Sequence, residues 1–113
     1  MADSENLMEI TDGNFQSEIA GAQGLAMVDF WAEWCAPCRL IGPSVAQLAD
    51  QYAGQVKVGK LDVDSNQRTA AQFNVRSIPT ILFFKDGQVV DTVVGALPKQ
   101  VLERKLQEHL NPA

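Results

Sequence analysis

Residues 26–41 read AMVDFWAEWCAPCRLI, and this stretch decides what the rest of the chain must form. Positions 26–31 are apolar except for Asp29, a pattern typical of a strand that is buried on both faces of a parallel sheet. Cys35 and Cys38 follow this run, where apolar positions begin to recur at helical spacing. The stretch therefore predicts a buried strand, a short loop, and a helix that begins at a cysteine pair.

The other apolar runs predict a β-α-β-α-β-α-β-β-α order. The expected strands are 7–10, 26–31, 56–63, 81–84 and 89–94, and the expected helices lie around 15–19, 35–52, 65–73 and 98–110. Strand–helix–strand crossovers give parallel pairing, and Asp86-Gly87 between the last two runs predicts an antiparallel hairpin. We therefore expect an α/β fold in one domain, residues 1–113, with a central mixed sheet of four or five strands flanked by helices on both faces.

Short polar residues precede two of these helices and are the expected N-caps, because their side-chain oxygens can accept hydrogen bonds from free backbone N–H groups. Thr11 and Asp12 occupy this place before the first helix. Asp64 or Ser65 occupies it before the third.

Composition limits the classes of function. Of the 113 residues, 46% are hydrophobic and 20% charged, as in ordinary globular proteins. A net charge of -5 and a pI near 4.6 argue against binding to nucleic acid or to an anionic membrane. The polar start, residues 1–6, does not resemble a secretory signal, so we expect a cytoplasmic protein whose cysteines do not serve as a structural disulfide.

The cysteine pair has three interpretations. Free cysteines pack well as small hydrophobic residues, so the pair could be structural. Zinc would need four ligands, yet only His109, expected to be solvated in the last helical turn, adds to the pair, so no metal site is expected. Position favours redox chemistry, because a helix amino terminus stabilises a thiolate at Cys35, and Cys38 lies on the same helical face.

Longer motifs connect the chain to a known family. WCAPCR at 34–39, preceded by VDFWA at 28–32, strongly resembles the thioredoxin family, and the resemblance continues through KLDVD at 60–64, IPT at 78–80 and VGA at 94–96. It implies the thioredoxin fold and a thiol–disulfide oxidoreductase that reduces target proteins through a mixed disulfide. Cys35 would be the nucleophile and Cys38 the resolving thiol. The implied centre is a redox-active Cys35–Cys38 disulfide without a bound cofactor, in a monomer that receives electrons from thioredoxin reductase.

The resemblance also implies roles for other residues. Asp29, an acid inside an apolar strand, could be a purely structural group paired with Lys60 on the next strand, whose charge would oppose the rise in pKa that burial causes. The resemblance favours a catalytic role, in which Asp29 transfers a proton to and from Cys38 and Lys60 modulates its pKa. A cis bond before Pro79 would leave the Ile78 backbone free to pair with a substrate peptide. Residues around Cys35 would form an apolar rim for target proteins, here called the target rim: Trp34, Ala36, Pro37, Ile78, Pro79, Val94, Gly95 and Ala96. Trp31 would pack beneath them.

Two rival functions remain open at this point. A thioredoxin-fold oxidase or isomerase would donate or shuffle disulfides, but Trp34, Pro37 and the lack of a recognisable secretory signal favour a reductase. A non-catalytic binding module would use only the target rim, as a subunit of a larger complex. Arg39, where the family more often has lysine, leaves the assignment unchanged. Ala36, where the family more often has glycine, could shift the reduction potential in either direction.

Overall fold

The computed structural model describes residues 4–111, so the two ends of the predicted 1–113 domain lie outside it. Five strands form a single sheet in the order β1-β3-β2-β4-β5. They are β1 (Leu7–Glu9), β2 (Leu25–Trp31), β3 (Val56–Asp62), β4 (Thr80–Lys85) and β5 (Gln88–Val94). β1 and β2 run parallel to β3, whereas β4 runs antiparallel to β2 and to β5. The mixed sheet is thus confirmed, with five strands.

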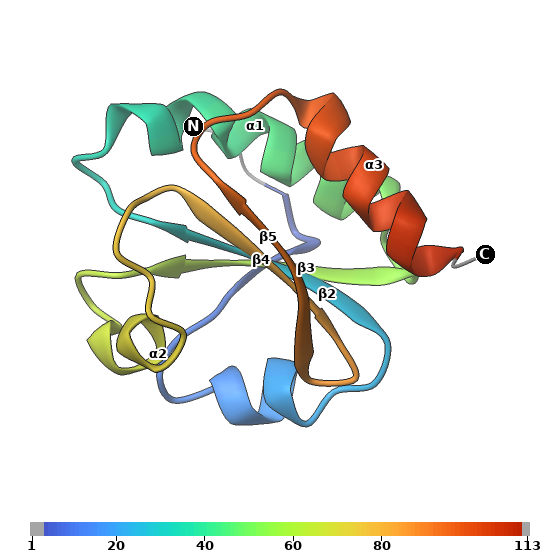
Figure 1. Ribbon diagram of the computed structural model, residues 1–113, viewed down its shortest axis with the longest axis horizontal. Coiled ribbons are helices and arrows are strands. Elements are labelled where there is room, and N and C mark those ends of the chain that lie inside the picture. Colours follow the sequence, from blue (N-terminus) through green and yellow to red (C-terminus); the bar gives the residue numbers. More distant parts are fainter. Residues whose placement is uncertain (1–3, 112–113) are drawn as a thin grey trace.

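Helices cover both faces of this sheet. They are the π-helix η1 (Gln16–Ala20) and the α-helices α1 (Ala36–Gln51), α2 (Gln67–Gln72) and α3 (Lys99–Leu110). α1 and α3 lie on one face, and η1 and α2 lie on the other (Figure 1). Successive side chains of β2 point to opposite faces, so Met27 packs with Leu48 and Leu106 in one core, and Val28 packs with Ile19 in the other. Within residues 4–111, no helix is long and apolar enough to cross a membrane.

The β4–β5 connection is the predicted hairpin. Lys85 pairs with Gln88, which leaves Asp86 and Gly87 as a two-residue turn. Both have positive φ, 51° and 83°, as a type I′ turn requires. Residues other than glycine rarely adopt such backbone angles, so the Asp-Gly pair favours this turn. The pairing of β4 with β5 then shifts by one residue between Phe83 and Phe84.

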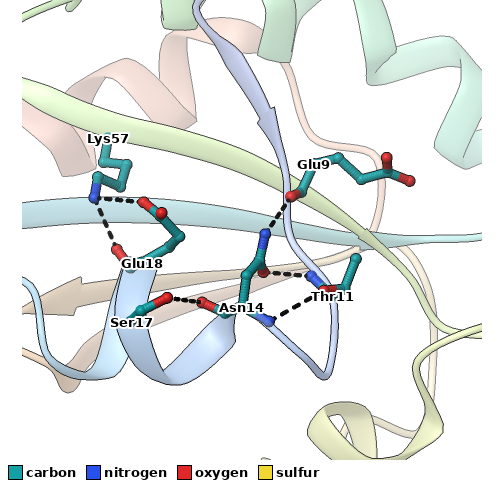
Figure 2. Close-up of polar contacts among 6 residues, drawn as sticks. All are labelled: Glu9, Thr11, Asn14, Ser17, Glu18 and Lys57. Atoms are coloured by element: carbon teal, nitrogen blue, oxygen red, sulfur yellow. Dashed lines mark hydrogen bonds and ion pairs between the residues drawn. The ribbon is translucent and has the colours of Figure 1, made fainter.

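Polar contacts fasten the segment between β1 and η1 (Figure 2). The Thr11 Oγ1 accepts a hydrogen bond from the Asn14 N–H at 3.1 Å, and the Asn14 Oδ1 accepts one from the Thr11 N–H at 2.7 Å. Lys57 of β3 donates to both the carbonyl oxygen and the carboxylate of Glu18, at 3.0 and 3.1 Å. Thr11 thus stabilises the turn before η1 rather than capping the helix as predicted, because the N-cap residue of η1 is Phe15 and no side chain caps it. Lys57 ties η1 to the sheet.

The expected N-cap of α2 is wrong. Asn66, rather than Asp64 or Ser65, occupies the N-cap position, and its side chain makes no capping hydrogen bond. Asp12 supplies the cap from a distance, because its Oδ1 accepts from the backbone N–H and the hydroxyl of Thr69 at 2.8 and 2.7 Å. The side-chain hydrogen bond from Thr69 is the main reason that the pKa of Asp12 lies below its usual value. Asp12, predicted to cap the first helix, thus caps a helix far along the chain.

Candidate active site

The cysteine pair lies where β2 ends and α1 begins. Cys35 is the N-cap residue of α1, with an extended backbone, and its Sγ accepts a hydrogen bond from the Cys38 N–H at 3.2 Å. The two cysteines form a disulfide. Only 5% of Cys35 and 2% of Cys38 is exposed, so the sulfur atoms are open to partners only over a small area. Because the free N–H groups and the positive dipole end of α1 point at Cys35, its thiolate is stabilised after reduction.

Two loops meet Cys35 from the other side. The Ile78–Pro79 peptide bond is cis, and the carbonyl oxygen of Ile78 lies 3.9 Å from the Sγ of Cys35. The Gly95 N–H donates to the carbonyl oxygen of Pro79 at 2.8 Å, and Gly95 has a φ of 101°, which favours glycine. Three segments that lie far apart in the sequence, at Cys35, at Ile78–Pro79 and at Gly95, thus meet beside the disulfide.

Most of the target rim is exposed around this point. Trp34 is 68% exposed and Val94 58%, and Ala36, Pro37 and Ala96 are also exposed. Gly95 and Ile78 are half-buried and Pro79 is buried. Within residues 4–111, no group accepts a hydrogen bond from the Ile78 N–H, which leaves this donor available. Large exposed apolar side chains beside a reactive group are typical of a binding surface.

Asp29 is a buried acid with an unpartnered oxygen. It lies in β2, is 3% exposed, and within residues 4–111 its Oδ1 has no hydrogen-bond partner. Burial raises the pKa of Asp29 to about 7, and the positive charge of Lys60 opposes part of this rise. The group therefore changes its charge close to neutral pH.

Asp29 and Lys60 lie on neighbouring strands, as expected, but they do not form the expected ion pair. The two residues are neighbours in the β2–β3 register. However, the ion pairs among residues 4–111 do not include them, because the Lys60 ammonium lies over the ring of Trp31, 4.8 Å from its centroid. Lys60 acts on Asp29 through space rather than through a hydrogen bond. Trp31 packs against the cluster of Ala32, Cys35 and Cys38 beneath the disulfide.

A pocket of about 660 Å³ connects the buried acid with Cys38. Asp29 and Cys38 both line it, together with Glu33, Arg39 and Lys60. A space of this size holds water, which can carry a proton between groups that do not touch. The pocket thus gives Asp29 and Cys38 a common connection to solvent.

Residues that the sequence analysis did not place at the site also contribute. Arg39 donates from Nη1 to the carbonyl oxygen of Glu33 at 2.7 Å, and the Trp34 indole N–H donates to Asp64 at 2.8 Å. A signal for Asp64 existed, because the carboxyl ends of parallel β2 and β3 lie at one sheet edge and an indole N–H seeks an acceptor. No pattern in the sequence pointed to the backward reach of Arg39.

His109 lies in a different place from the cysteines. It stands in the last turn of α3, as predicted, but it is half-buried and its Nε2 lies 3.0 Å from the carboxylate of Asp91. The expectation of a solvated histidine is therefore wrong. Among residues 4–111, no three or more His, Cys, Asp and Glu side chains form a cluster that could hold a metal ion.

The sheet order, the N-cap cysteine with its partner three residues on, and the cis-proline loop beside them define a class: proteins that exchange dithiols and disulfides on this fold. Comparison with known proteins agrees. The family model described as Thioredoxin matches residues 6–108. Thioredoxin 2 of Chlorobaculum tepidum is 50% identical over 107 residues, which cover 95% of this chain and 98% of the relative. The thioredoxin of Haemophilus influenzae is 48% identical over 104 residues, covering 92% and 97%. The chain belongs to the thioredoxin family.

This membership confirms the predicted fold and activity. The protein is a thiol–disulfide oxidoreductase of the protein-disulfide reductase type, and its redox group is the Cys35–Cys38 disulfide rather than a bound cofactor. The alternative of a non-catalytic binding module is not favoured. Members of this family act on disulfide-containing targets, and the resemblance to them holds over nearly the whole chain.

Proposed function

We propose that Cys35 attacks the disulfide of a target protein and that Cys38 resolves the resulting mixed disulfide. The observation that carries this assignment is the place of Cys35 at the N-cap of α1, where its sulfur accepts the Cys38 N–H at 3.2 Å. This arrangement lowers the energy of a thiolate at Cys35, whereas Cys38 lies inside the helix and is less exposed. Only the thiolate is a nucleophile, so Cys35 reacts first.

The exchange balances in two steps. The Cys35 thiolate attacks one target sulfur, which forms the mixed disulfide and releases the second target sulfur as a thiolate that takes up a proton. Cys38 then loses its proton and attacks the Sγ of Cys35. The new Cys35–Cys38 bond expels the first target sulfur as a thiolate, which takes up the proton that Cys38 released. The target thus leaves as a dithiol, and this protein is oxidised by two electrons.

Asp29 is the proposed acceptor of the Cys38 proton. Both residues line the same pocket, and the buried carboxylate has an unpartnered oxygen and a pKa raised to about 7. A base with this pKa accepts a proton at neutral pH and returns it readily. Lys60 tunes this pKa by its charge, from above the Trp31 ring.

The target rim is proposed to hold an extended segment of the target. The free N–H of Ile78 offers a backbone hydrogen bond, and Gly95 beside Pro79 permits close approach of another chain. We further propose that the protein works as a monomer in the cytoplasm, with a thioredoxin reductase as the electron donor.

A coupled assay tests this function. Thioredoxin reductase and NADPH are supplied, and reduction of a protein disulfide is followed together with NADPH consumption. Cys38→Ser is expected to stop turnover and to accumulate a mixed disulfide between Cys35 and the target. This adduct appears as a band of higher molecular mass on a non-reducing gel. Cys35→Ser, the matched control, is expected to stop turnover without an adduct. An adduct formed through Cys38 in that control would reverse the assigned roles.

A further inference from the structure

The loop between β2 and α1 is fastened from two sides, just before the cysteines. From α1, the Arg39 Nη1 donates to the carbonyl oxygen of Glu33 at 2.7 Å. From the loop after β3, the Oδ2 of Asp64 accepts the Trp34 indole N–H at 2.8 Å. These bonds hold two adjacent residues, one through the backbone and the other through the side chain.

Without such bonds, Trp34 would be expected to move. It is 68% exposed, so packing restrains its indole only weakly. Its preceding residue, Glu33, is exposed and lies in a turn outside the regular elements. An exposed aromatic side chain that must find one orientation on binding loses rotamer freedom, which weakens binding. The two bonds fix this orientation before a target arrives.

The backbone of Arg39 is fixed in α1, and its exposed side chain reaches back to the loop. Its backbone N–H donates to the carbonyl oxygen of Cys35 at 3.2 Å, in the first turn of α1. Its guanidinium therefore connects the loop to the same helical turn that holds the cysteines. A charged donor gives a strong hydrogen bond to a carbonyl group. The bond therefore ties the Glu33 carbonyl to the first turn of α1.

We propose that Arg39 is a positioning residue for protein targets: its bond to the Glu33 carbonyl fixes the Glu33–Trp34 segment and thereby the orientation of Trp34 beside Cys35. Asp64 accepts the indole N–H of Trp34 directly, and its own backbone N–H donates to the carboxylate of Asp62 at 2.9 Å. The proposal rests on the proposed function, because it concerns targets that contact Trp34 as Cys35 reacts. Small disulfides that do not reach Trp34 do not depend on the bond between Arg39 and the Glu33 carbonyl.

The test compares Arg39→Met, which keeps a long side chain but removes the donor, with Arg104→Met. Arg104 is an exposed arginine of α3, so its substitution matches the change in net charge. For Arg39→Met, KM for a protein disulfide is expected to rise by about 3- to 10-fold with kcat unchanged. Turnover of a small aromatic disulfide is expected to stay the same. The rise in KM should persist at about 0.5 M salt, where long-range charge effects are screened.

A spectroscopic measurement on the intact protein reports on the orientation of Trp34 independently of activity. The protein contains two tryptophans, so two indole N–H signals appear in a proton–nitrogen NMR spectrum, and Trp34→Phe assigns them. In Arg39→Met, the Trp34 signal should shift and exchange with solvent faster, whereas the Trp31 signal should stay in place. If the wild-type protein reduces neither disulfide, the proposed function is rejected. The NMR measurement still tests whether Arg39 positions Trp34.

Three results would overturn the proposal. An unchanged KM together with an unchanged Trp34 signal would show that the bond does not position the segment. Equal losses with the protein and the small disulfide would place the effect at the cysteines instead. A KM difference that disappears at high salt, or that Arg104→Met reproduces, would assign the effect to charge.

Discussion

Asp29 and Asp91 show how two regions of one small molecule treat the same side chain. Asp29 lies in β2 below the cysteines, is 3% exposed and keeps an oxygen without a hydrogen-bond partner. Asp91 lies in β5, where its carboxylate contacts Lys105 at 3.1 Å and His109 at 3.0 Å, both on α3. The first carboxylate is deprived of partners and the second is surrounded by donors.

The pKa values of these acids move in opposite directions. Burial raises the pKa of Asp29 to about 7, only partly opposed by Lys60. Partial burial also acts to raise the pKa of Asp91, but hydrogen bonds from His109 and Lys105 outweigh it and hold this pKa below the usual value of 3.8. Near neutral pH, Asp29 thus opposes folding when it is charged, whereas Asp91 fastens α3 to the sheet. The contrast separates a group that we propose to serve chemistry from one that serves stability.

The largest effect is expected for Asp29→Asn, which removes the buried charge. A folded-state pKa of about 7 against 3.8 means that ionisation costs the native state about 4 kcal/mol above pH 7. The unfolded chain loses its proton first, so the stability of the wild type should fall as pH rises from 3.8 to 7. Asp29→Asn should therefore be more stable by about 2–4 kcal/mol at pH 8.5, with little difference near pH 4, in urea unfolding at both pH values.

The same variant tests the proposed proton transfer. Without the acceptor for the Cys38 proton, disulfide exchange at pH 7 should slow by up to about 100-fold. Stopped-flow reduction of a protein disulfide across pH 6–8 measures this. Rates that match the wild type throughout this range would remove Asp29 from the mechanism, even if the gain in stability is found.

A smaller and opposite effect is expected for Asp91→Asn. This change weakens the contacts with Lys105 and His109, so the protein should lose about 1–2 kcal/mol of stability at pH 6. Because the folded-state pKa is lowered, the contribution is complete above the unfolded value of 3.8 and is lost as pH falls through the folded value. The difference from the wild type should shrink below pH 3.8, and disulfide exchange at pH 7 should not change. Slower exchange would contradict the separation of the two regions.

The smallest effect is expected for Lys60→Met, which keeps an apolar side chain over Trp31 but removes the charge. Because that charge opposes the rise, its loss should move the pKa of Asp29 further above 7. At pH 8.5 the protein should be less stable by about 1 kcal/mol or less. A carboxyl titration followed by NMR measures the shift directly, and an Asp29 pKa that is unchanged or lower would show that Lys60 does not act on this group.

Much of the fold could be predicted because it depends on patterns along the chain. The continuous apolar run of β2 indicates a central strand, and β2 does lie between the parallel strand β3 and the antiparallel strand β4. Asp86-Gly87 can adopt the positive φ values that its turn requires. The start of α2 could not be predicted in this way. Asp64 and Ser65 are good capping residues locally, but the helix begins at Gln67 and takes its cap from Asp12. Local preference fails where a distant residue supplies a better partner.

The candidate site shows the same limit. The motifs predict which residues gather near Cys35, and the family comparison supports the reaction. They do not predict where long, flexible side chains end. Lys60 extends over Trp31 rather than to Asp29, and Arg39 reaches back to the Glu33 carbonyl. Such contacts depend on the space that the folded chain leaves, and sequence spacing does not record it.

The cap that Asp12 provides for α2 also limits the order in which the chain can assemble. α2 has six residues, too few to persist alone in water. Its first turn is completed by a residue 57 positions earlier, so it gains stability only after the segment following β1 has docked beside it. During folding, the amide protons of α2 therefore become protected from exchange only after the segment that carries Asp12 has docked beside the helix.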